Sequence, residues 1–132
     1  MANEQTKQTI LVVEDDLPVL RALTDKLMRE GFHLLQAKDG EEGLMVALRD
    51  RPDLILLDIL LPKMDGLTMM KKLRAENEWG KTVPVILLTN LSPDKEEINK
   101  SISECEPAYY LVKTNWSMAD VVEKVRERLS RQ

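Results

Sequence analysis

Acidic residues directly follow two apolar segments of this chain. Asp58 ends the run Leu-Ile-Leu-Leu at 54–57, and Glu14, Asp15 and Asp16 follow Ile-Leu-Val-Val at 10–13. Runs this apolar are typical of strands buried on both faces of a parallel sheet. Such sheets carry ligand chemistry at the carboxyl ends of their strands. If the two strands are neighbours, their carboxylates converge on one edge. Like charges that close are unfavourable without a cation, so we predict a divalent metal site.

Two more polar residues end apolar segments further along the chain. Thr89 ends the segment 84–89 and Lys113 ends the segment 109–113. Together with the carboxylates they form a chemically coherent set. Mg²⁺ prefers carboxylate and carbonyl oxygens, and an ionised Asp58 can act as a nucleophile toward a phosphoryl group. The cation, the Lys113 ammonium and the Thr89 hydroxyl would share the negative charge of that phosphoryl group.

The elements that must position these residues alternate regularly along the chain. Apolar patterning predicts strands at 10–14, 32–37, 54–58, 84–89 and 109–113. One helix is expected between each pair of consecutive strands, and a fifth helix after the last strand. Strict alternation of five strands with five helices predicts an α/β fold, with a doubly wound parallel sheet covered by helices on both faces.

Capping signals locate the helices. Pro18 opens the first helix, which ends at Gly31, and Asp39 caps the second. The third helix buries its Leu67 side and is expected to end at Gly80. Two further signals start the remaining helices, namely Ser92-Pro93 and the pair Ser117 and Asp120, which resembles a capping box.

Composition bounds the class of protein. The 132 residues carry a net charge of −4 and are enough for one domain, expected at 9–132 after a disordered polar tail at 1–8. There is no basic stripe, so we expect no direct binding of nucleic acid by this domain. Apolar stretches fall short of the ~20 residues that span a bilayer, and the N-terminus lacks a secretory pattern. Cytoplasmic residence is therefore the expectation, and the single Cys105 fits a reducing compartment.

Four ordered segments resemble the receiver domains of two-component response regulators. They are Ile-Leu-Val-Val-Glu-Asp-Asp at 10–16, Asp-Leu-Ile-Leu-Leu-Asp-Ile-Leu-Leu-Pro-Lys-Met-Asp-Gly at 53–66, Val-Pro-Val-Ile-Leu-Leu-Thr at 83–89 and Tyr-Leu-Val-Lys at 110–113. The resemblance covers residues 9 to about 130. It implies a flavodoxin-like (βα)5 fold with strand order 2-1-3-4-5, similar to the chemotaxis regulators. It also implies a phosphorylation-controlled switch rather than an enzyme with substrate turnover, one that catalyses only its own phosphotransfer and slow autodephosphorylation.

The resemblance assigns a role to each matching residue. Asp58 is the phosphoacceptor, and a histidine kinase or a histidine phosphotransfer protein would supply the phosphoryl group. Mg²⁺, for which Mn²⁺ can substitute, would be bound by Asp15, by Asp58, by the backbone carbonyl of Leu60 and, through water, by Glu14. Asp16 is expected to cap a helix or face outward rather than bind the metal.

The remaining assignments concern the response to phosphorylation. Thr89 would bond the phosphoryl oxygen and shift inward, Lys113 would pair with the acyl phosphate, and Tyr110 would switch between rotamers. The surface of the fourth helix, fifth strand and fifth helix would then change and control an output protein or an effector domain missing from this chain. Homodimer formation on phosphorylation is left open.

Several positions depart from the family pattern. Asn90 stands where a small residue usually follows Thr89, Thr114 replaces the proline after Lys113, and Glu106-Pro107 replaces a Gly-Ala pair. These changes flank the switch surface and leave the acceptor chemistry intact. Leu60 and Leu91 are apolar at positions that border the attacking water in the family, from which we predict slow hydrolysis of the phosphoaspartate.

Two alternatives remain open. The first is a pseudo-receiver that binds partners without being phosphorylated, an interpretation that Asn90 and Thr114 keep open and the full acidic set opposes. The second is an aspartate-nucleophile phosphohydrolase. Such enzymes need an acidic residue two positions after the nucleophile, where this chain has Leu60, so sustained phosphatase turnover is not expected.

Overall fold

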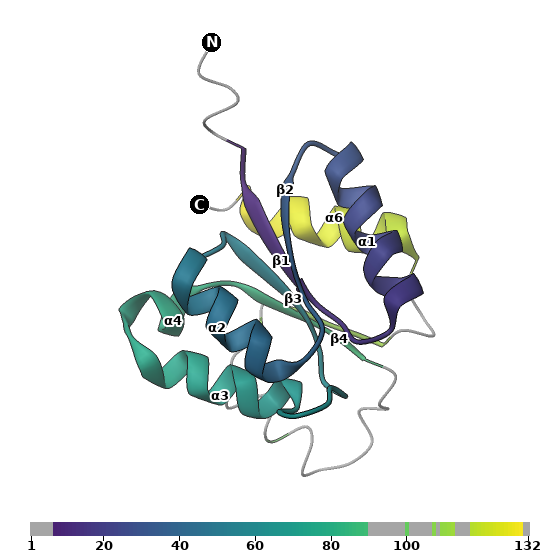
Figure 1. Cartoon of the computed structure of the whole chain (residues 1–132). Helices are drawn as coiled ribbons and strands as arrows, with labels where there is room; N and C mark the ends of the chain where they lie inside the picture. The colour runs from purple at the N-terminus through teal and green to yellow at the C-terminus, as the bar shows by residue number, and fades with distance from the viewer. Residues whose placement is uncertain (1–6, 90–99, 101–106, 108, 113–116, 131–132) are drawn as a thin grey trace.

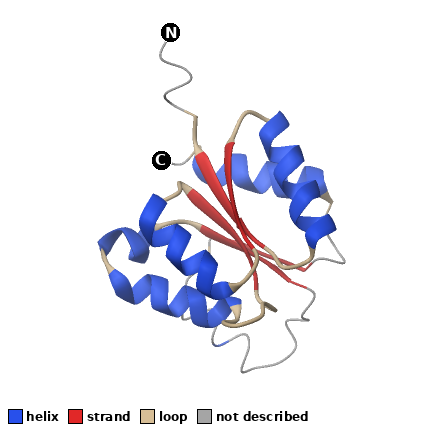
Figure 2. Cartoon of the chain, in the orientation of Figure 1, coloured by secondary structure: helices blue, strands red, loops and turns tan. Residues whose placement is uncertain are grey.

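Five parallel strands form the centre of the molecule. The computed structural model describes residues 7–89, 100, 107, 109–112 and 117–130. Within them the sheet has the order β2-β1-β3-β4-β5, as predicted (Figures 1 and 2). The strands are β1 (Thr9–Val13), β2 (His33–Ala37), β3 (Leu54–Asp58), β4 (Val85–Thr89) and β5 (Tyr109–Val112). This is the doubly wound, flavodoxin-like arrangement.

The apolar runs at 10–13 and 54–57 are central strands because both of their faces are covered. All eight residues are at most 1% exposed. Ile10 pairs with Leu54 and Val13 pairs with Leu57, so β1 and β3 run in register to the same edge. Residues that immediately follow these strands must therefore lie near one another.

Helices cover the two faces of the sheet in separate layers (Figure 1). On one face, α1 (Leu17–Arg29) and α6 (Met118–Leu129) pack on alternate strand residues such as Ile10 and Leu56. On the other face lie α2 (Gly40–Asp50), α3 (Gly66–Glu76) and the short α4 (Glu78–Thr82). Alternate residues such as Leu11 and Leu57 contribute to the core on that side. The predicted helix after Ser92 lies outside the described residues.

Most of the predicted caps are confirmed. Asp16 and Asp39 accept hydrogen bonds from backbone N–H groups at the start of α1 and α2, and Asp65, which was not predicted as a cap, does the same for α3. Ser117 and Asp120 form the predicted reciprocal capping box of α6. These bonds satisfy N–H groups that have no partner within their own helix.

The predicted end of the third helix is wrong. The structure ends α3 at Glu76, and Gly80 lies inside the separate helix α4. Asn77 adopts an extended backbone and accepts a hydrogen bond from the Gly80 N–H at 2.7 Å, so it ends one helix and caps the next. A Cβ on Gly80 would collide with the carbonyl oxygen of Leu73. Gly80 is therefore explained by close packing between α3 and α4.

A polar contact also joins α1 to α6. The Arg126 guanidinium donates to the carbonyl oxygen of Glu30 at 3.0 Å and to its carboxylate at 2.7 Å. It also lies 5.3 Å from the centre of the Phe32 ring. This contact joins the end of α1 to the last turns of α6.

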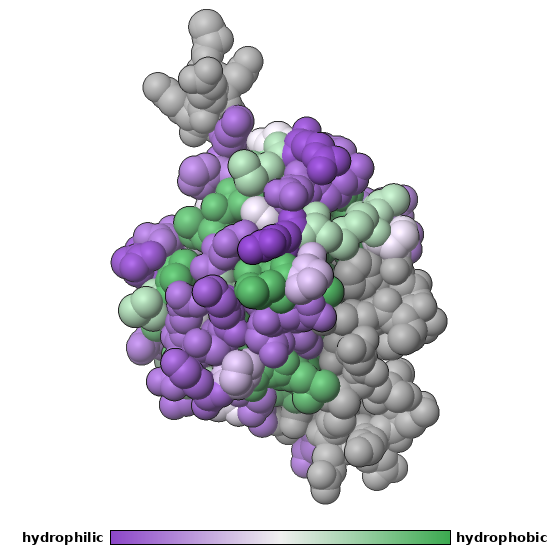
Figure 3. Space-filling view, turned by 45° about the vertical axis from the view of Figure 1, so that its right-hand side comes forward, coloured by the Kyte–Doolittle hydropathy of each residue, from purple (hydrophilic) through white to green (hydrophobic). Residues whose placement is uncertain are grey.

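The surface mixes hydrophilic and apolar side chains. On the face seen in Figure 3, hydrophilic residues surround small apolar groups. Large exposed apolar side chains among the described residues include Leu17 and Leu60. No described helix combines the length and apolar character needed to cross a membrane.

Candidate functional site at the carboxyl edge of the sheet

Glu14 and Asp58 lie at the ends of adjacent central strands. Val13 pairs with Leu57, which places the next residue of each strand at the same edge. The Glu14 N–H donates to the Ala37 carbonyl at 3.0 Å and so continues the pairing of β1 with β2. Glu14 is only 1% exposed and Asp58 only 5% exposed. Two carboxylates are thus largely removed from water within one small region.

Asp15 completes a cluster of three carboxylates. One oxygen each from Glu14, Asp15 and Asp58 lie within 4.8 Å of one another. Asp15 is exposed, so the cluster is open to solvent on its side. Carboxylates this close repel one another, and a divalent cation would relieve that repulsion. The donor set fits Mg²⁺, which takes a few carboxylate oxygens and keeps several waters.

Asp16 is separate from this cluster, as predicted. Its side chain caps α1 by accepting from the Val19 N–H at 3.5 Å. Its own N–H donates to Glu14 Oε2 at 3.2 Å. Asp16 therefore orients Glu14 through the backbone, and its carboxylate serves the helix.

The loop after β3 folds back over Asp58. The Leu60 N–H donates to Asp58 Oδ1 at 3.2 Å, and the Gly66 N–H donates to the Ile59 carbonyl at 2.8 Å. A Cβ on Gly66 would collide with the Asp58 carbonyl oxygen. Glycine is required there because α3 begins in direct contact with Asp58. The use of the Leu60 carbonyl as a metal ligand stays a prediction.

The same loop is supported by a contact with α2. Sequence reasoning missed this contact. Lys63 adopts a left-handed conformation with φ 66°, and its Nζ lies 3.8 Å from Asp39 Oδ2. Gly40 lies directly against the carbonyl of Met64, where a Cβ would not fit. Asp39 was interpreted only as a helix cap, and Gly40 was given no role. Their support of the loop depends on a tertiary contact.

The other predicted site residues are described only in part. Thr89 ends β4 and pairs with Val112, while Asp58 pairs with Leu88, so these strand ends reach the same edge. Nothing is described of the Thr89 and Tyr110 side chains, and Lys113 lies outside the described residues. The family departures at Asn90, Glu106 and Thr114 also lie outside them, as does Leu91.

The sequence profile of the response regulator receiver domain matches residues 10–126. Because this match covers most of the chain, the chain belongs to the receiver domain family of two-component response regulators. It is therefore a signalling domain, and the acidic cluster at its sheet edge is consistent with binding of Mg²⁺.

Curated relatives include bacterial regulators of transcription. The chain is 34% identical over 122 residues to the DNA-binding dual master transcriptional regulator RpaA of Synechocystis, covering 92% of this chain and 49% of that protein. It is 44% identical over 82 residues to the probable transcriptional regulatory protein TcrX of Mycobacterium tuberculosis, covering 61% of this chain and 33% of that protein. The chain thus spans between a third and a half of the length of these relatives.

Solved structures share the fold over nearly the whole chain. A CheY-like receiver domain protein from Methanospirillum hungatei has a TM-score of 0.86 at 25% identity, covering 96% of each chain. The BeF3-activated N-terminal receiver domain of Klebsiella pneumoniae RstA has a TM-score of 0.80 at 31% identity, covering 94% of this chain and 99% of that chain.

Proposed function

We propose that this chain is a phosphorylation-controlled switch whose phosphoacceptor is Asp58. The observation that carries the proposal is the convergence of Asp58 with Glu14 and Asp15, whose carboxylate oxygens lie within 4.8 Å of one another at a strand-end edge. The phosphoryl donor would be a phosphohistidine on a histidine kinase or a histidine phosphotransfer protein. Membership of the receiver family supports this donor class.

The transfer forms one bond and breaks one. A carboxylate oxygen of Asp58 attacks the phosphorus atom, and the bond from phosphorus to the donor imidazole nitrogen breaks as that nitrogen recovers its electron pair. Asp58 is buried and its Oδ1 accepts the Leu60 N–H at 3.2 Å, so its orientation is held by the backbone. The burial keeps water away from part of the carboxylate.

The Mg²⁺ ion would be bound directly by Asp15, by Asp58 and by the backbone carbonyl of Leu60. Glu14 would bind it through a water molecule. Mn²⁺ could take the place of Mg²⁺. Bound there, the cation would neutralise charge on the carboxylates and on the transferring phosphoryl group. Lys113 and the Thr89 hydroxyl are proposed to share that charge after the transfer.

Phosphorylation would act on a pre-existing equilibrium between two arrangements of the output surface. The Thr89 hydroxyl moves toward the phosphoryl group, and Tyr110 changes rotamer as it does so. Both residues belong to strands that reach the site edge, which supports a path from Asp58 to the surface of β5, α6 and the helix predicted after Ser92. That surface would then control a partner, with homodimer formation as one form of output.

The rest of the assignment follows from the family. We infer that 9–132 is the receiver unit, that it acts in the cytoplasm, and that its output is an effector domain or a separate protein. The relatives named as regulators of transcription favour an effector of that kind, with nucleic acid bound by the effector rather than by this domain. Leu60, exposed by 53% and unable to orient water, supports slow hydrolysis of the phosphoaspartate and opposes phosphatase turnover.

A phosphodonor assay tests the proposal. Incubation with acetyl phosphate and Mg²⁺ is expected to add one phosphoryl group to the wild type, detected by intact-protein mass spectrometry, and none to Asp58→Asn. Chelation of Mg²⁺ should abolish labelling of the wild type. Asp25→Asn, which changes an exposed carboxylate on α1, is the matched control and should label normally.

Two outcomes would contradict the proposal. Equal labelling of the Asp58→Asn protein would move the acceptor elsewhere. A folded wild type that is neither labelled nor altered in fluorescence by Mg²⁺ and beryllofluoride would favour the pseudo-receiver. Rapid loss of the phosphoryl group after removal of the donor would refute only the prediction of slow self-hydrolysis, and the acceptor assignment would stand.

A further inference from the structure

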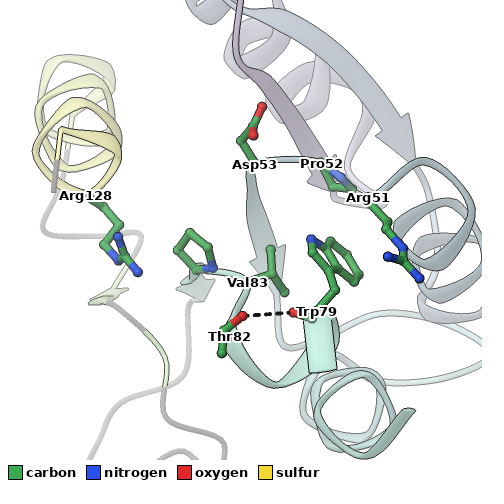
Figure 4. Close-up of a pocket in the computed structure, with 8 residues that line it drawn as sticks. Arg51, Pro52, Asp53, Trp79, Thr82, Val83 and Arg128 are labelled. Carbon is green, nitrogen blue, oxygen red and sulfur yellow. Dashed lines mark hydrogen bonds between the residues drawn. The ribbon is translucent and has the colours of Figure 1, made fainter. Parts of the chain in front are cut away.

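A recess lies at the opposite edge of the sheet from Asp58. It encloses about 510 Å³ and is formed where strands begin rather than end (Figure 4). Asp53 directly precedes β3, Val83 and Pro84 directly precede β4, and Arg128 reaches it from α6. Its volume is within the range of ordinary small-molecule sites. The proposed phosphorylation chemistry uses none of the side chains that line it.

An indole forms one wall of the recess. Trp79 of α4 is half-buried, and the Arg51 guanidinium lies 6.0 Å from the centre of its ring. Figure 4 shows the indole between Arg51 on one side and Val83 on the other. The cation–π contact helps to fix the orientation of the ring. Val83 and Pro84 are buried and give the recess an apolar base.

Two guanidiniums at the rim have no acidic partner within the described part of the chain. Among the described residues, neither Arg51 nor Arg128 forms an ion pair with a carboxylate. Asp53 lines the recess, but its Oδ2 accepts the Thr9 N–H at 2.7 Å, and Figure 4 shows its carboxylate directed away from Trp79. The Thr82 hydroxyl is engaged with the Trp79 carbonyl at 3.4 Å. The available hydrogen-bonding groups are therefore mainly cationic donors.

The backbone of Arg51 adds an independent observation. Arg51 ends α2 in the left-handed conformation, with φ 44°, where glycine is the usual residue. A long side chain at such a position costs conformational free energy, and strained residues of this kind cluster at ligand sites. Here the strained backbone places the guanidinium against the indole.

We propose that this recess binds a small molecule made of a flat aromatic ring that carries a carboxylate or a phosphate. The ring would stack on the part of the Trp79 indole that lines the recess, beside Val83 and Pro84. The anionic group would accept hydrogen bonds from the Arg128 guanidinium, and the charge of Arg51 would add to the attraction. Stacking alone or charge alone would bind weakly in so open a site. The combination selects an aromatic anion.

Titrations followed by ¹H–¹⁵N correlation NMR test the proposal. The probes are 1-naphthoate, its uncharged analogue 1-naphthamide, inorganic phosphate and an acidic, phenylalanine-containing peptide. We expect 1-naphthoate to shift the Trp79 indole N–H signal, which is assigned by its loss in Trp79→Phe. Removal of a charged donor in Arg128→Gln should weaken naphthoate binding about tenfold. Arg21→Gln, an exposed arginine on α1, is the matched control and should bind as the wild type.

Each other result overturns the proposal. Equal binding of naphthoate and naphthamide, unchanged in Arg128→Gln, would show non-specific apolar contact. If inorganic phosphate were the only probe that shifted NMR signals at the recess, the site would bind simple anions without a role for the aromatic ring. A response only to an acidic, phenylalanine-containing peptide would assign the recess to a protein partner. No shifts with any probe would show that the recess is structural. Dispersed NMR spectra confirm that each variant is folded, and Asp58 labelling should be unchanged in all of them.

Discussion

Lys63 shows how a single residue supports the loop after β3 at a conformational cost. It lies five residues after Asp58 in the left-handed region, with φ 66°, where a Cβ is unfavourable. Its ammonium lies 3.8 Å from Asp39 Oδ2, but the side chain is 65% exposed. An ion pair this exposed contributes little because water screens it. The backbone conformation, rather than the charge, therefore dominates the energetics at this position.

Lys63→Gly is expected to stabilise the protein. Glycine removes about 1–2 kcal/mol of left-handed strain and gives back part of it as chain entropy in the unfolded state, leaving a gain of about 0.5–1 kcal/mol. Urea unfolding followed by circular dichroism measures the change. Lys63→Ala is the control, because it removes the ammonium and keeps the Cβ. Equal effects of the two substitutions would assign the energetics to the ion pair instead.

At the scale of elements, the contact between α1 and α6 is a polar link between two helices of one layer. Its participants are Glu30 and Arg126, 96 residues apart in sequence. The hydrogen bond from Arg126 lowers the pKa of Glu30 below its ordinary value of 4.5, with a smaller contribution from Lys26, and partial burial opposes the shift. Because α6 also belongs to the proposed output surface, this contact would anchor that surface to the neighbouring helix α1.

The pKa shift of Glu30 predicts the pH dependence of this contact. A lowered pKa in the folded state means that the stabilisation is present above 4.5 and is lost as the pH falls through the lower, folded value. Glu30→Gln should therefore be less stable than the wild type at neutral pH, and the difference should disappear in more acidic solution. Urea unfolding at a series of pH values measures it.

The control for this prediction is Glu123→Gln. Glu123 is an exposed carboxylate of α6 that forms no ion pair within the described part of the chain. Its substitution should leave the pH profile close to that of the wild type. If the Glu30→Gln difference were the same at every pH, the contact would act through packing rather than through the charge of Glu30.

At the scale of the whole molecule, charge is distributed unevenly between the two edges of the sheet. The carboxyl edge holds the cluster of Glu14, Asp15 and Asp58, and the amino edge holds the recess with Arg51 and Arg128. The first arrangement would attract cations, and the second is proposed above to attract an anion. Together the two assignments predict ligands of opposite charge at opposite ends of one sheet.

Removal of one carboxylate from the cluster should increase the thermal stability of the metal-free protein. In the absence of divalent metal, Asp15→Asn is expected to raise the thermal unfolding midpoint by a few °C, because it relieves repulsion among three close carboxylates. Added Mg²⁺ should stabilise the wild type and have much less effect on the variant. Differential scanning calorimetry with and without Mg²⁺ measures both effects.

Asp16→Asn separates cluster repulsion from a general effect of net charge. Asp16 is adjacent in sequence, but its carboxylate caps α1 and is not part of the cluster. Its substitution should not raise the midpoint in metal-free solution, and Mg²⁺ should still stabilise the protein. A midpoint that rises equally in both variants would contradict the repulsion argument.

Much of the fold was predictable because its signals are local. The buried runs at 10–13 and 54–57, the caps Asp39 and Ser117, and the alternation of strands with helices all follow from short-range patterns. The carboxylate cluster was predictable from the rule that parallel strands end at one edge. The boundary near Gly80 was not, because an Asn77 that ends one helix and caps the next is indistinguishable in sequence from a continuous helical pattern.

The sequence by itself determined which chemical groups meet at the carboxyl edge: a carboxylate follows each of two central strands, and from this a cation site that includes Asp58 was predicted. Only the tertiary structure decided what supports and surrounds that site. The packing of Gly40 on the Met64 carbonyl and the recess between Trp79 and Arg128 join segments that no local pattern relates. Strand ends follow a general rule of parallel sheets, whereas side-chain contacts between distant elements depend on how those elements pack.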